Sequence, residues 1–507
     1  MADRKTDAEV HLPLDLVVEC ILSRLPVRYI ARAVCRAAAE TLSAPTKDLV
    51  ARLRGDAALW AAEHGGLRDR GVATAGVFAL SGLTRELRDV VAAGCRMDRS
   101  TCARAAIGGH LETLKWARAA GCPWDAQTCA NAAFGGHLET LVWARAEGCP
   151  WDATTCSSAA SVGRLDIIQW AREAGCQWDS LTCSNAARCG HLDVLKWAHA
   201  EGCPWDANTC TCAARGGHLD VLQWAREAGC PWSVMTASHA AMTGHLDVLQ
   251  WAREAGCPWS AEVCSFAARG GHIEVLKWAR GAGCPWDERT CSYAARGGHL
   301  EVLKWARQEG CPWGELTCCF AAAGGHLECL KWARHGCPWE SCPWNELTCS
   351  CAAEGGHLEV LRWARQEGCP WDFKACQLAA QGGHMEVLKW AIEAGCPWGD
   401  TICSASASGG HLATLKWARG AGCPWDKWTC FQAAQKGHLD VLKWTHEAGC
   451  QWDATTCSAA ASGGHLEVLK WAREAGCPWS TETWFEAVRG GHPDTMAWLR
   501  ESGCPTF

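Results

Sequence analysis

No part of this 507-residue chain contains the run of roughly 18 apolar residues that a membrane-spanning helix needs. Its first residues, Met1 to Glu9, mix both charges and lack the apolar centre of a secretory signal. We therefore expect no membrane partner and a cytoplasmic or nuclear location. An excess of basic charge is missing as well. The formal net charge is −7, which argues against a nucleic-acid-binding surface.

Motifs of enzyme active sites are also absent. The chain has no His-Glu-x-x-His, Gly-x-Ser-x-Gly or Walker pattern. Because the candidate residues recur from repeat to repeat, no single acid, base or nucleophile stands out. We therefore expect no enzyme, no catalytic residue and no cofactor. The alternation of apolar and polar residues that marks a strand is missing too, so we expect helices only.

What the sequence has in abundance is an internal repeat, seen clearly from Thr290 to Trp313. Its histidine recurs every 27 residues, as at His272, His299 and His326, with one longer step of 31 to His357. Arg164 replaces the histidine in one copy. A fixed period of this length predicts a solenoid, in which each unit contacts only its neighbours.

One repeat predicts two short helices. Asp287 suits an N-cap, and a first helix over about 288–296 ends at the Gly297-Gly298 pair. A second helix starts at Leu300 and ends at Gly310, before a proline. Its apolar arc covers more than half the circumference, which is typical of a helix packed between neighbours. The fold class is therefore an all-α solenoid of about 15–16 helix-turn-helix repeats.

These repeats resemble the ankyrin family. The matching phrases are Thr-Cys-x-x-Ala-Ala-x-x-Gly-His-Leu-Glu-Val-Leu-Lys and Glu-Ala-Gly-Cys, over about residues 84–504. The usual ankyrin unit is longer, at 33 residues, and the shortfall lies mainly in the segment that forms its projecting β-hairpin. The resemblance implies a protein-binding array whose first helices line the concave side, with tight loops in place of hairpins.

The N-terminal segment resembles a second family, the F-box. Two Leu-Pro pairs, an Ile-Leu pair and the later Val-Cys-Arg match that motif, whereas Ala38 stands where it usually has tryptophan. The resemblance implies docking on the adaptor of a cullin–RING ubiquitin ligase through the following residues: Leu12, Pro13, Leu16, Ile21, Leu22, Leu25 and Pro26. The alternative is a helical cap that covers the first repeat.

The domain organisation follows from these two resemblances. We expect a flexible segment over 1–10, the F-box-like helices over 11–45, and a helical linker with a degenerate first repeat over 46–94. The repeat array then covers 95–507, with one longer loop at 334–345. That loop duplicates Cys-Pro-Trp, either as a slipped duplication or as a bend or contact loop.

The 33 tryptophans fall mainly in two columns, one in the second helix and one in the Cys-Pro-Trp loop. Buried indoles would stabilise repeats that lack hairpin contacts, so we expect them in the core. The alternative is an exposed stacking ladder for sugars or single-stranded nucleic acid, which needs cationic grooves beside the rings.

The 37 cysteines have three interpretations: buried small hydrophobes, zinc ligands or disulfides. A chain with no export signal favours reduced thiols. Cys284 and Cys291 lack the short ligand separation of structural zinc sites, and Ala237 and Trp484 each replace a column cysteine. We therefore expect buried thiols and no metal site, and keep a Cys/His metal array as a lesser alternative.

We expect structural roles for two further sets of recurring residues, the histidine and the charged residues of the second helix. The ankyrin resemblance implies that the repeated histidine braces a loop by hydrogen-bonding to backbone, and Arg164 at the same position agrees with a structural role. Glu, Lys and Arg of the second helix predict a solvated convex face with i,i+3 ion pairs.

The remaining columns change from repeat to repeat and are free to bind a target protein. In the first helices, one of these variable columns forms an aromatic stripe of His239, Phe266, Tyr293 and Phe320. Its flanking arginines are Arg215, Arg269 and Arg296. Aromatic and arginine side chains anchor protein interfaces, which makes this the predicted target-binding site. Neutral drift on a solvated surface is the alternative.

Overall fold

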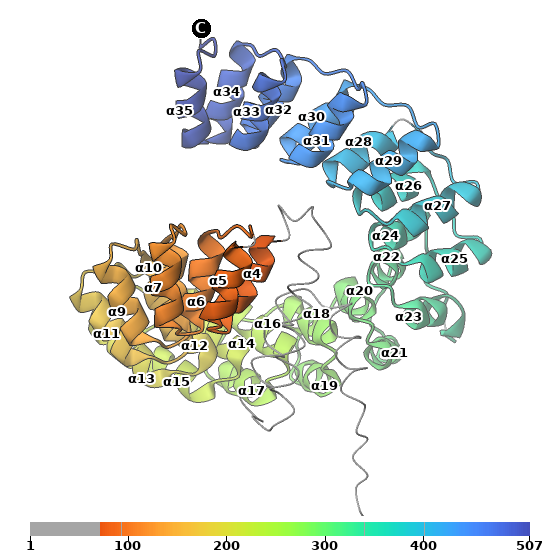
Figure 1. The fold of residues 1–507 in the computed structure, drawn as a ribbon. Helices are drawn as coiled ribbons and strands as arrows, with labels where there is room; N and C mark the ends of the chain where they lie inside the picture. Colours follow the sequence, from red (N-terminus) through yellow and green to blue (C-terminus); the bar gives the residue numbers. More distant parts are fainter. Residues whose placement is uncertain (1–70, 93, 339, 400, 507) are drawn as a thin grey trace, which may run out of the picture. The chain divides into compact units, whose positions relative to one another are not determined.

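The computed structural model describes residues 71–506 except 93, 339 and 400 (Figure 1). Within these residues the regular elements are all helices, arranged as helix-turn-helix repeats, which confirms the predicted fold class. The predicted F-box-like segment, including Leu12, Pro13, Leu16, Ile21, Leu22, Leu25 and Pro26, lies outside the described residues.

The first helices of the repeats carry even numbers and the second helices mostly odd ones. The first helices are α4 (Gly71–Leu80), α6 (Arg99–Ile107), α8 (Ala126–Phe134), α10 (Ala153–Ser161), α12 (Ser180–Cys189), α14 (Ala207–Gly216), α16 (Val234–Thr243), α18 (Ala261–Gly270), α20 (Glu288–Gly297), α22 (Glu315–Ala323), α24 (Glu346–Glu354), α26 (Phe373–Gln381), α28 (Thr401–Ser408), α30 (Lys427–Gln435), α32 (Ala454–Ser462) and α34 (Thr481–Gly490). The second helices are α5 (Thr84–Ala92), α7 (Leu111–Ala119), α9 (Leu138–Ala146), α11 (Leu165–Glu173), α13 (Leu192–Ala200), α15 (Leu219–Glu227), α17 (Leu246–Glu254), α19 (Ile273–Gly281), α21 (Leu300–Gln308), α23 (Leu327–Lys331) with the π-helical turn η1 (Trp332–Gly336), α25 (Leu358–Gln366), α27 (Met385–Glu393), α29 (Leu412–Gly420), α31 (Leu439–Glu447), α33 (Leu466–Glu474) and α35 (Pro493–Glu501).

The helix ends follow from local sequence signals. The Asp287 carboxylate accepts a hydrogen bond from the Arg289 backbone N–H at 3.0 Å and caps α20. Gly298 ends that helix with φ of 75°, a conformation that favours glycine. The predicted helices at 288–296 and from Leu300 therefore match α20 and α21 to within a residue.

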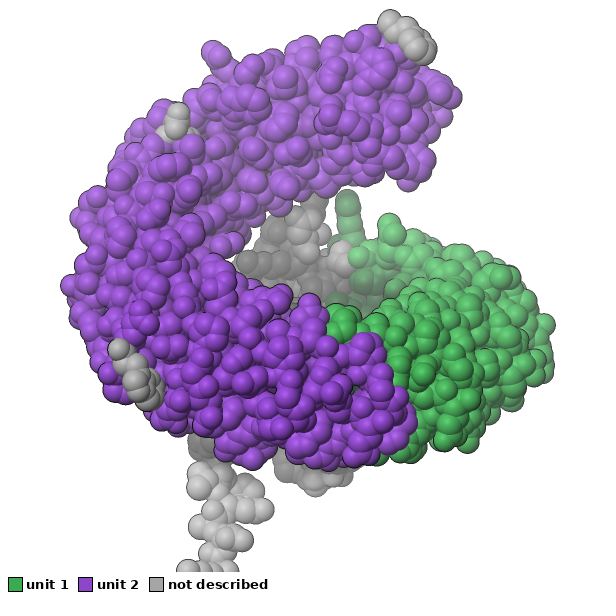
Figure 2. Space-filling model, turned by 180° about the vertical axis from the view of Figure 1, so that it is seen from behind, with its two compact units in different colours: residues 1–236 green, residues 237–507 purple. Residues whose placement is uncertain are grey.

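The chain divides into two compact units, one ending at Thr236 and the other beginning at Ala237 (Figure 2). Within each unit, successive first helices pack against each other along their length, whereas successive second helices meet only at a few points. The first helices therefore lie on the inner side of each unit (Figure 1).

Small residues make this close packing of first helices feasible. In α20, Cys291, Ala294 and Ala295 are fully buried, as is Thr290. The second helix contributes its larger apolar residues, such as Leu303, which is also fully buried. The predicted burial of the column cysteines is thus confirmed, and the core consists chiefly of alanine, cysteine, leucine and valine.

The tryptophans depart from the prediction, because the paired indoles are only half-buried. In most repeats the loop tryptophan meets the second-helix tryptophan of the following repeat, edge to face or tilted. Trp286 and Trp305, for example, have ring centroids 6.0 Å apart at 66°. The small residues between the first helices leave no space for an indole, so the rings cover the core at its outer edge. Trp398 and Trp428 are 38% and 51% exposed.

The second-helix arginines also differ from the prediction of a solvated face, because they contact the loop tryptophans. The Arg307 guanidinium lies 4.3 Å above the Trp313 ring and donates a hydrogen bond of 2.6 Å to the Cys311 carbonyl. The arginine therefore ties the second helix to the loop that follows it. The i,i+3 ion pairs are confirmed, as for Lys304 and Glu301 at 2.7 Å.

The histidine column braces backbone, as predicted. The Nε2–H of His299 donates to the Arg269 carbonyl oxygen of the preceding repeat at 3.1 Å. Arg164, in place of a histidine, donates through its guanidinium to the Gly136 carbonyl. Histidine rings also pack on the glycines of the neighbouring repeat: a Cβ at Gly298 would lie 2.4 Å from the His326 ring.

The duplicated Cys-Pro-Trp loop resolves into one regular copy and one insertion. The second copy takes the usual position, because the Cys342 thiol donates to the Gly314 carbonyl at 3.3 Å and Arg334 lies 4.1 Å above the Trp344 ring. The first copy begins at Cys337, directly after η1. His335, just before it, approaches the Glu367 carboxylate at 3.0 Å.

Across the described part of the chain, every helix is too short or too polar to span a bilayer.

The glycine–histidine packing predicts a difference between two left-handed glycines. Gly310→Ala meets no atom within 4 Å and should cost only the left-handed backbone penalty, about 1–2 kcal/mol. Gly298→Ala must also displace the His326 ring and should cost a further ~1–3 kcal/mol. Denaturant unfolding of both variants measures this. Equal losses would show that the ring does not brace the repeat.

The histidine column also predicts acid sensitivity. Burial lowers the pKa of His137, His272, His326 and His465 below the usual value. These rings stay neutral when folded and bind protons more readily when unfolded, so their contribution is complete above pH ~6.5 and is lost as pH falls through the folded pKa. The urea midpoint should therefore drop between about pH 7 and pH 5. His326→Gln should reduce that slope, and a midpoint independent of pH would contradict the assignment.

Candidate target-binding surface

The aromatic stripe lies on the inner, first-helix side of the second unit. His239, Phe266, Tyr293 and Phe320 project from α16, α18, α20 and α22, which are consecutive first helices. Each side chain is partly exposed. The helix packing positions them, because the small residues on both sides of each ring are buried, as Ser265 and Ala267 are beside Phe266.

The rings form a continuous ladder. The centroids of His239 and Phe266 are 5.9 Å apart at 42°. Phe266 and Tyr293 are stacked at 6.3 Å and 21°, and Tyr293 and Phe320 at 6.0 Å and 15°. The structure therefore brings together all four aromatic residues of the predicted site, in sequence order and in contact.

Two of the flanking arginines complete the ladder. The Arg269 guanidinium lies 6.0 Å from the Tyr293 ring centroid, and that of Arg296 lies 5.4 Å from the Phe320 ring centroid. Both side chains are exposed, so their charge stays available to solvent or to a partner. Arg215 is also exposed but belongs to α14 of the first unit, so it is not part of this cluster.

Sequence reasoning missed an apolar continuation of this surface. Leu316 on α22, Leu347 on α24 and Phe373 on α26 are 44%, 41% and 47% exposed. They occupy the first turns of consecutive first helices. The signal for Leu316 and Leu347 was available in the sequence, since polar residues usually occupy the position before the repeat threonine.

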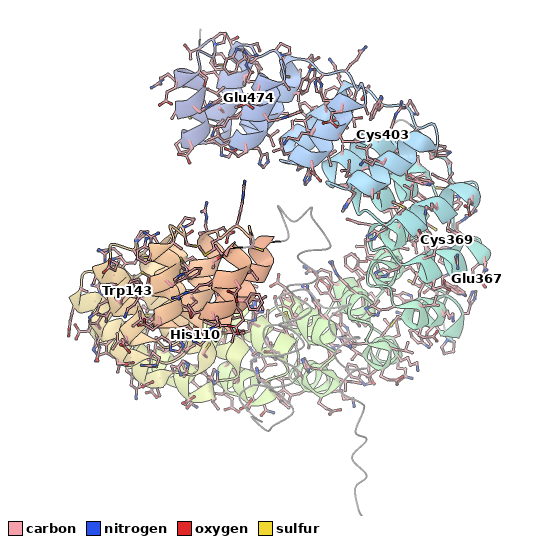
Figure 3. The ribbon with its side chains drawn as sticks, in the orientation of Figure 1. His110, Trp143, Glu367, Cys369, Cys403 and Glu474 are labelled. Atoms are coloured by element: carbon pink, nitrogen blue, oxygen red, sulfur yellow. The ribbon has the colours of Figure 1, made fainter. Side chains whose placement is uncertain are left out.

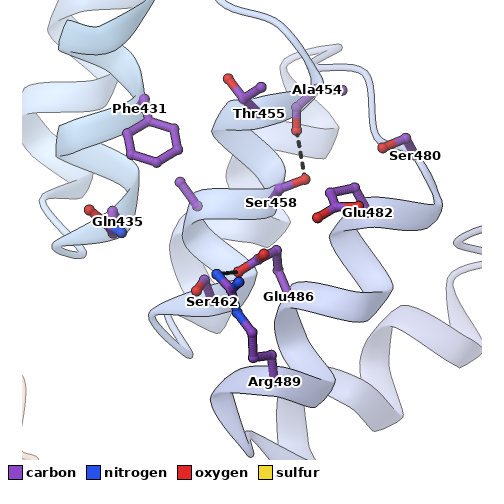
Figure 4. Close-up of a pocket in the computed structure, with 11 residues that line it drawn as sticks. Phe431, Gln435, Ala454, Thr455, Ser458, Ser462, Ser480, Glu482, Glu486 and Arg489 are labelled. Carbon is purple, nitrogen blue, oxygen red and sulfur yellow. Dashed lines mark hydrogen bonds and ion pairs between the residues drawn. The ribbon is translucent and has the colours of Figure 1, made fainter.

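A second feature missed from the sequence is a groove of about 260 Å³ over α30, α32 and α34 (Figure 4). Small residues of α32, such as Ala459, form its floor, and Phe431 of α30 forms one wall. On the other wall Glu486 pairs with Arg489 at 2.7 Å, with only 14% of the glutamate side chain exposed. The groove arises where large residues in neighbouring helices flank small ones.

The cysteine and histidine columns do not assemble into a conventional metal centre. Within residues 71–506, apart from the three undescribed positions, no group of three or more His, Cys, Asp or Glu side chains is placed to hold a metal ion. The column thiols instead donate to backbone carbonyls: Cys369, labelled in Figure 3, donates to the Asn345 carbonyl at 3.4 Å. Cys284, which the sequence analysis considered together with Cys291, donates to the Ser260 carbonyl at 3.4 Å.

Comparison with known proteins gives one family match. Residues 430–473 match the family described as ankyrin repeats in many copies, which supports the ankyrin resemblance over that segment. No curated protein matches the chain.

Two solved structures illustrate the chain's similarity to other helical repeats. The pentatricopeptide repeat protein PPR10 from maize is 14% identical with a TM-score of 0.28, covering 97% of this chain and 99% of its own. The human ASB11 ankyrin repeat domain is 16% identical with a TM-score of 0.27, covering 31% of this chain and 84% of its own. At scores this low neither likeness bears on function.

Proposed function

We propose that this protein is a non-catalytic binding scaffold that captures a target protein on the inner face of its repeat array. The ladder of His239, Phe266, Tyr293 and Phe320 with Arg269 and Arg296 is the principal contact surface. The observation that carries the proposal is this contiguous ladder of half-exposed aromatic rings with exposed guanidinium groups, on the one face whose residues vary between repeats.

Physical chemistry favours that face over the outer one. On the outer face, indoles pair with each other and arginines lie above them, so these groups already contribute to the scaffold. On the inner face, the rings stack on their ladder neighbours and keep part of their surface in water. A partner that covers them gains apolar burial, and its carboxylates can pair with the arginines.

The absence of catalysis is part of the proposal. The buried cysteines and bracing histidines recur in equivalent surroundings along the array, where they donate to backbone carbonyls, as Cys369 and His299 do. A catalytic centre needs a particular acid, base or nucleophile held beside a substrate. A repeated scaffold column supports packing rather than such a centre.

Replacing three side chains of the ladder tests the proposal. The variant Phe266→Ala/Arg269→Ala/Tyr293→Ala should lose roughly tenfold or more of target binding, because interface aromatics and arginines each contribute above about 1 kcal/mol. Affinity capture with the full chain, quantified by mass spectrometry, measures the loss. The melting temperature should fall by only a few degrees, since the rings are partly exposed.

A matched control removes three charges from the outer face. Lys277→Ala/Lys304→Ala/Lys331→Ala breaks exposed ion pairs, which contribute little to stability. It should leave capture unchanged. Equal capture by the ladder variant and the wild type, or loss with the lysine variant alone, would reject the inner face as the binding surface.

A second proposal concerns what the captured protein is delivered to. The F-box resemblance of residues 11–45 favours a substrate receptor that docks on the adaptor of a cullin–RING ubiquitin ligase. In that role the N-terminal segment recruits the ligase and the array presents the target. The competing role is a scaffold whose N-terminal segment only caps the repeats.

A pull-down of the purified adaptor by the full chain separates these two roles. Leu16→Asp/Ile21→Asp places charge on the apolar positions of the motif and should abolish adaptor binding. Asp15→Ala/Glu19→Ala, at polar positions of the same segment, should retain it. If the wild-type chain retains no adaptor, the ligase role is wrong and the scaffold role stands.

A further inference from the structure

The aromatic ladder has a regular spacing that constrains what can lie along it. Successive ring centroids of His239, Phe266, Tyr293 and Phe320 are 5.9, 6.3 and 6.0 Å apart. Side chains four residues apart in an α-helix form a ridge, and each step along that ridge rises by roughly 6.0 Å. Alternate residues of an extended strand are roughly 6.4–6.8 Å apart, which is longer than each step of the ladder. The ladder therefore matches a helical ridge, one side chain for each ring.

The hydrogen-bonding groups of the ladder also favour a helix over a strand. The rings of Phe266 and Phe320 carry no hydrogen-bonding group, and the guanidinium groups of Arg269 and Arg296 only donate. Across the described residues all regular elements are helices, so a strand finds no sheet edge to pair with on this face. An extended segment covered by the rings would leave backbone groups without partners, whereas a helix pairs its own.

The two long edges of the ladder carry opposite charges. The basic edge consists of Arg269 and Arg296, which are exposed in the last turns of α18 and α20. The acidic edge consists of Glu288 and Glu315, which are exposed in the first turns of α20 and α22. Glu288 and Arg296 are separated by roughly 12 Å along α20, and a helix with its side chains is about 10–12 Å wide. Both flanks of a helix on the ladder therefore reach charged groups.

The neighbouring charges keep the sign of the acidic edge. Arg289, in the first turn of α20, pairs with Asp287 at 2.8 Å, so its charge is already compensated. Glu262 adds a half-buried carboxylate to the first turn of α18. The Glu315 carboxylate accepts a hydrogen bond of 2.6 Å from the Asn345 side-chain amide, which is neutral and leaves the negative charge in place. The acidic edge therefore favours basic side chains of a partner.

From this spacing and charge we propose that the segment captured on the ladder is an amphipathic α-helix lying along the line from His239 to Phe320. Its apolar residues follow an i, i+4, i+8 ridge that packs against the rings. Its acidic flank faces Arg269 and Arg296, and its basic flank faces Glu288 and the neighbouring Glu315. This inference rests on the proposed function, because it names the kind of partner that the same surface takes.

Selection from a phage library of random peptides tests the proposal with the full chain. Peptides of about 16 residues are long enough for about four helical turns. Those enriched on the wild type are tested again on Phe266→Ala/Arg269→Ala/Tyr293→Ala and on the outer-face control Lys277→Ala/Lys304→Ala/Lys331→Ala. Peptides lost on the first variant and kept on the second are ladder-dependent. They should have apolar residues at i, i+4 and i+8, with acidic residues on one side of that ridge and basic residues on the other.

A charge exchange tests the assignment of the flanks. Arg269→Glu/Arg296→Glu should weaken binding of a selected peptide by about tenfold or more, because two attractions become repulsions. A second peptide, with lysines in place of the acidic flank, should bind this variant more tightly than it binds the wild type. Fluorescence anisotropy with labelled synthetic peptides measures both affinities. The exchange also controls for folding, since a misfolded variant would not gain affinity for the lysine peptide.

The outcomes separate this inference from the proposed function. Ladder-dependent peptides with apolar residues at alternate positions, or with no separation of charge, would overturn the helix and leave the ladder as a binding surface. A lysine peptide that prefers the wild type over the glutamate variant would overturn the assigned flanks. If no enriched peptide depends on the ladder, the ladder is not a peptide-binding surface, and the proposed function fails together with this inference.

Discussion

The fold depends on the close approach of successive first helices. Alanine pairs such as Ala294 and Ala295, with the cysteine beside them, are small enough to be buried completely between neighbouring helices. Every other feature follows from that contact. The larger indoles are left at the outer edge, the histidines reach the carbonyls of the preceding repeat, and variable side chains remain on the inner face. A bulky residue in the alanine column would separate two repeats and disturb all three.

Repeats this short compensate for their missing hairpin with many modest interactions rather than one strong one. The N-cap aspartate, the bracing histidine, the arginine above its tryptophan and the buried thiols each contribute on the order of 1 kcal/mol. Since each contact recurs along the chain, the loss of one contact affects only the repeats beside it. This explains how Arg164 in place of histidine, or Trp484 in place of cysteine, is tolerated.

Periodicity alone was sufficient to predict the helices, their caps and the buried thiols. Asp287, Gly298 and Leu300 mark ends that the structure reproduces. Periodicity was insufficient for features that depend on distances between side chains of different helices and loops. Helix packing sets the half-burial of Trp305, the stacking of Arg307 on Trp313 and the approach of the Cys349 sulfur to the Cys369 carbonyl. The aromatic ladder was predicted from its column, but its continuation at Leu347 and the groove beside Glu486 required the three-dimensional arrangement.

The central claim is that scaffold and recognition occupy opposite sides of each repeat in the second unit. Site-specific photo-crosslinking tests it most directly. A photoreactive phenylalanine analogue is placed either at position 293 on the inner face or at position 304 on the outer face, and cross-linked partners are counted on a gel. The account predicts a specific cross-linked protein from position 293 and none from position 304. Cross-linking from position 304 alone would contradict it.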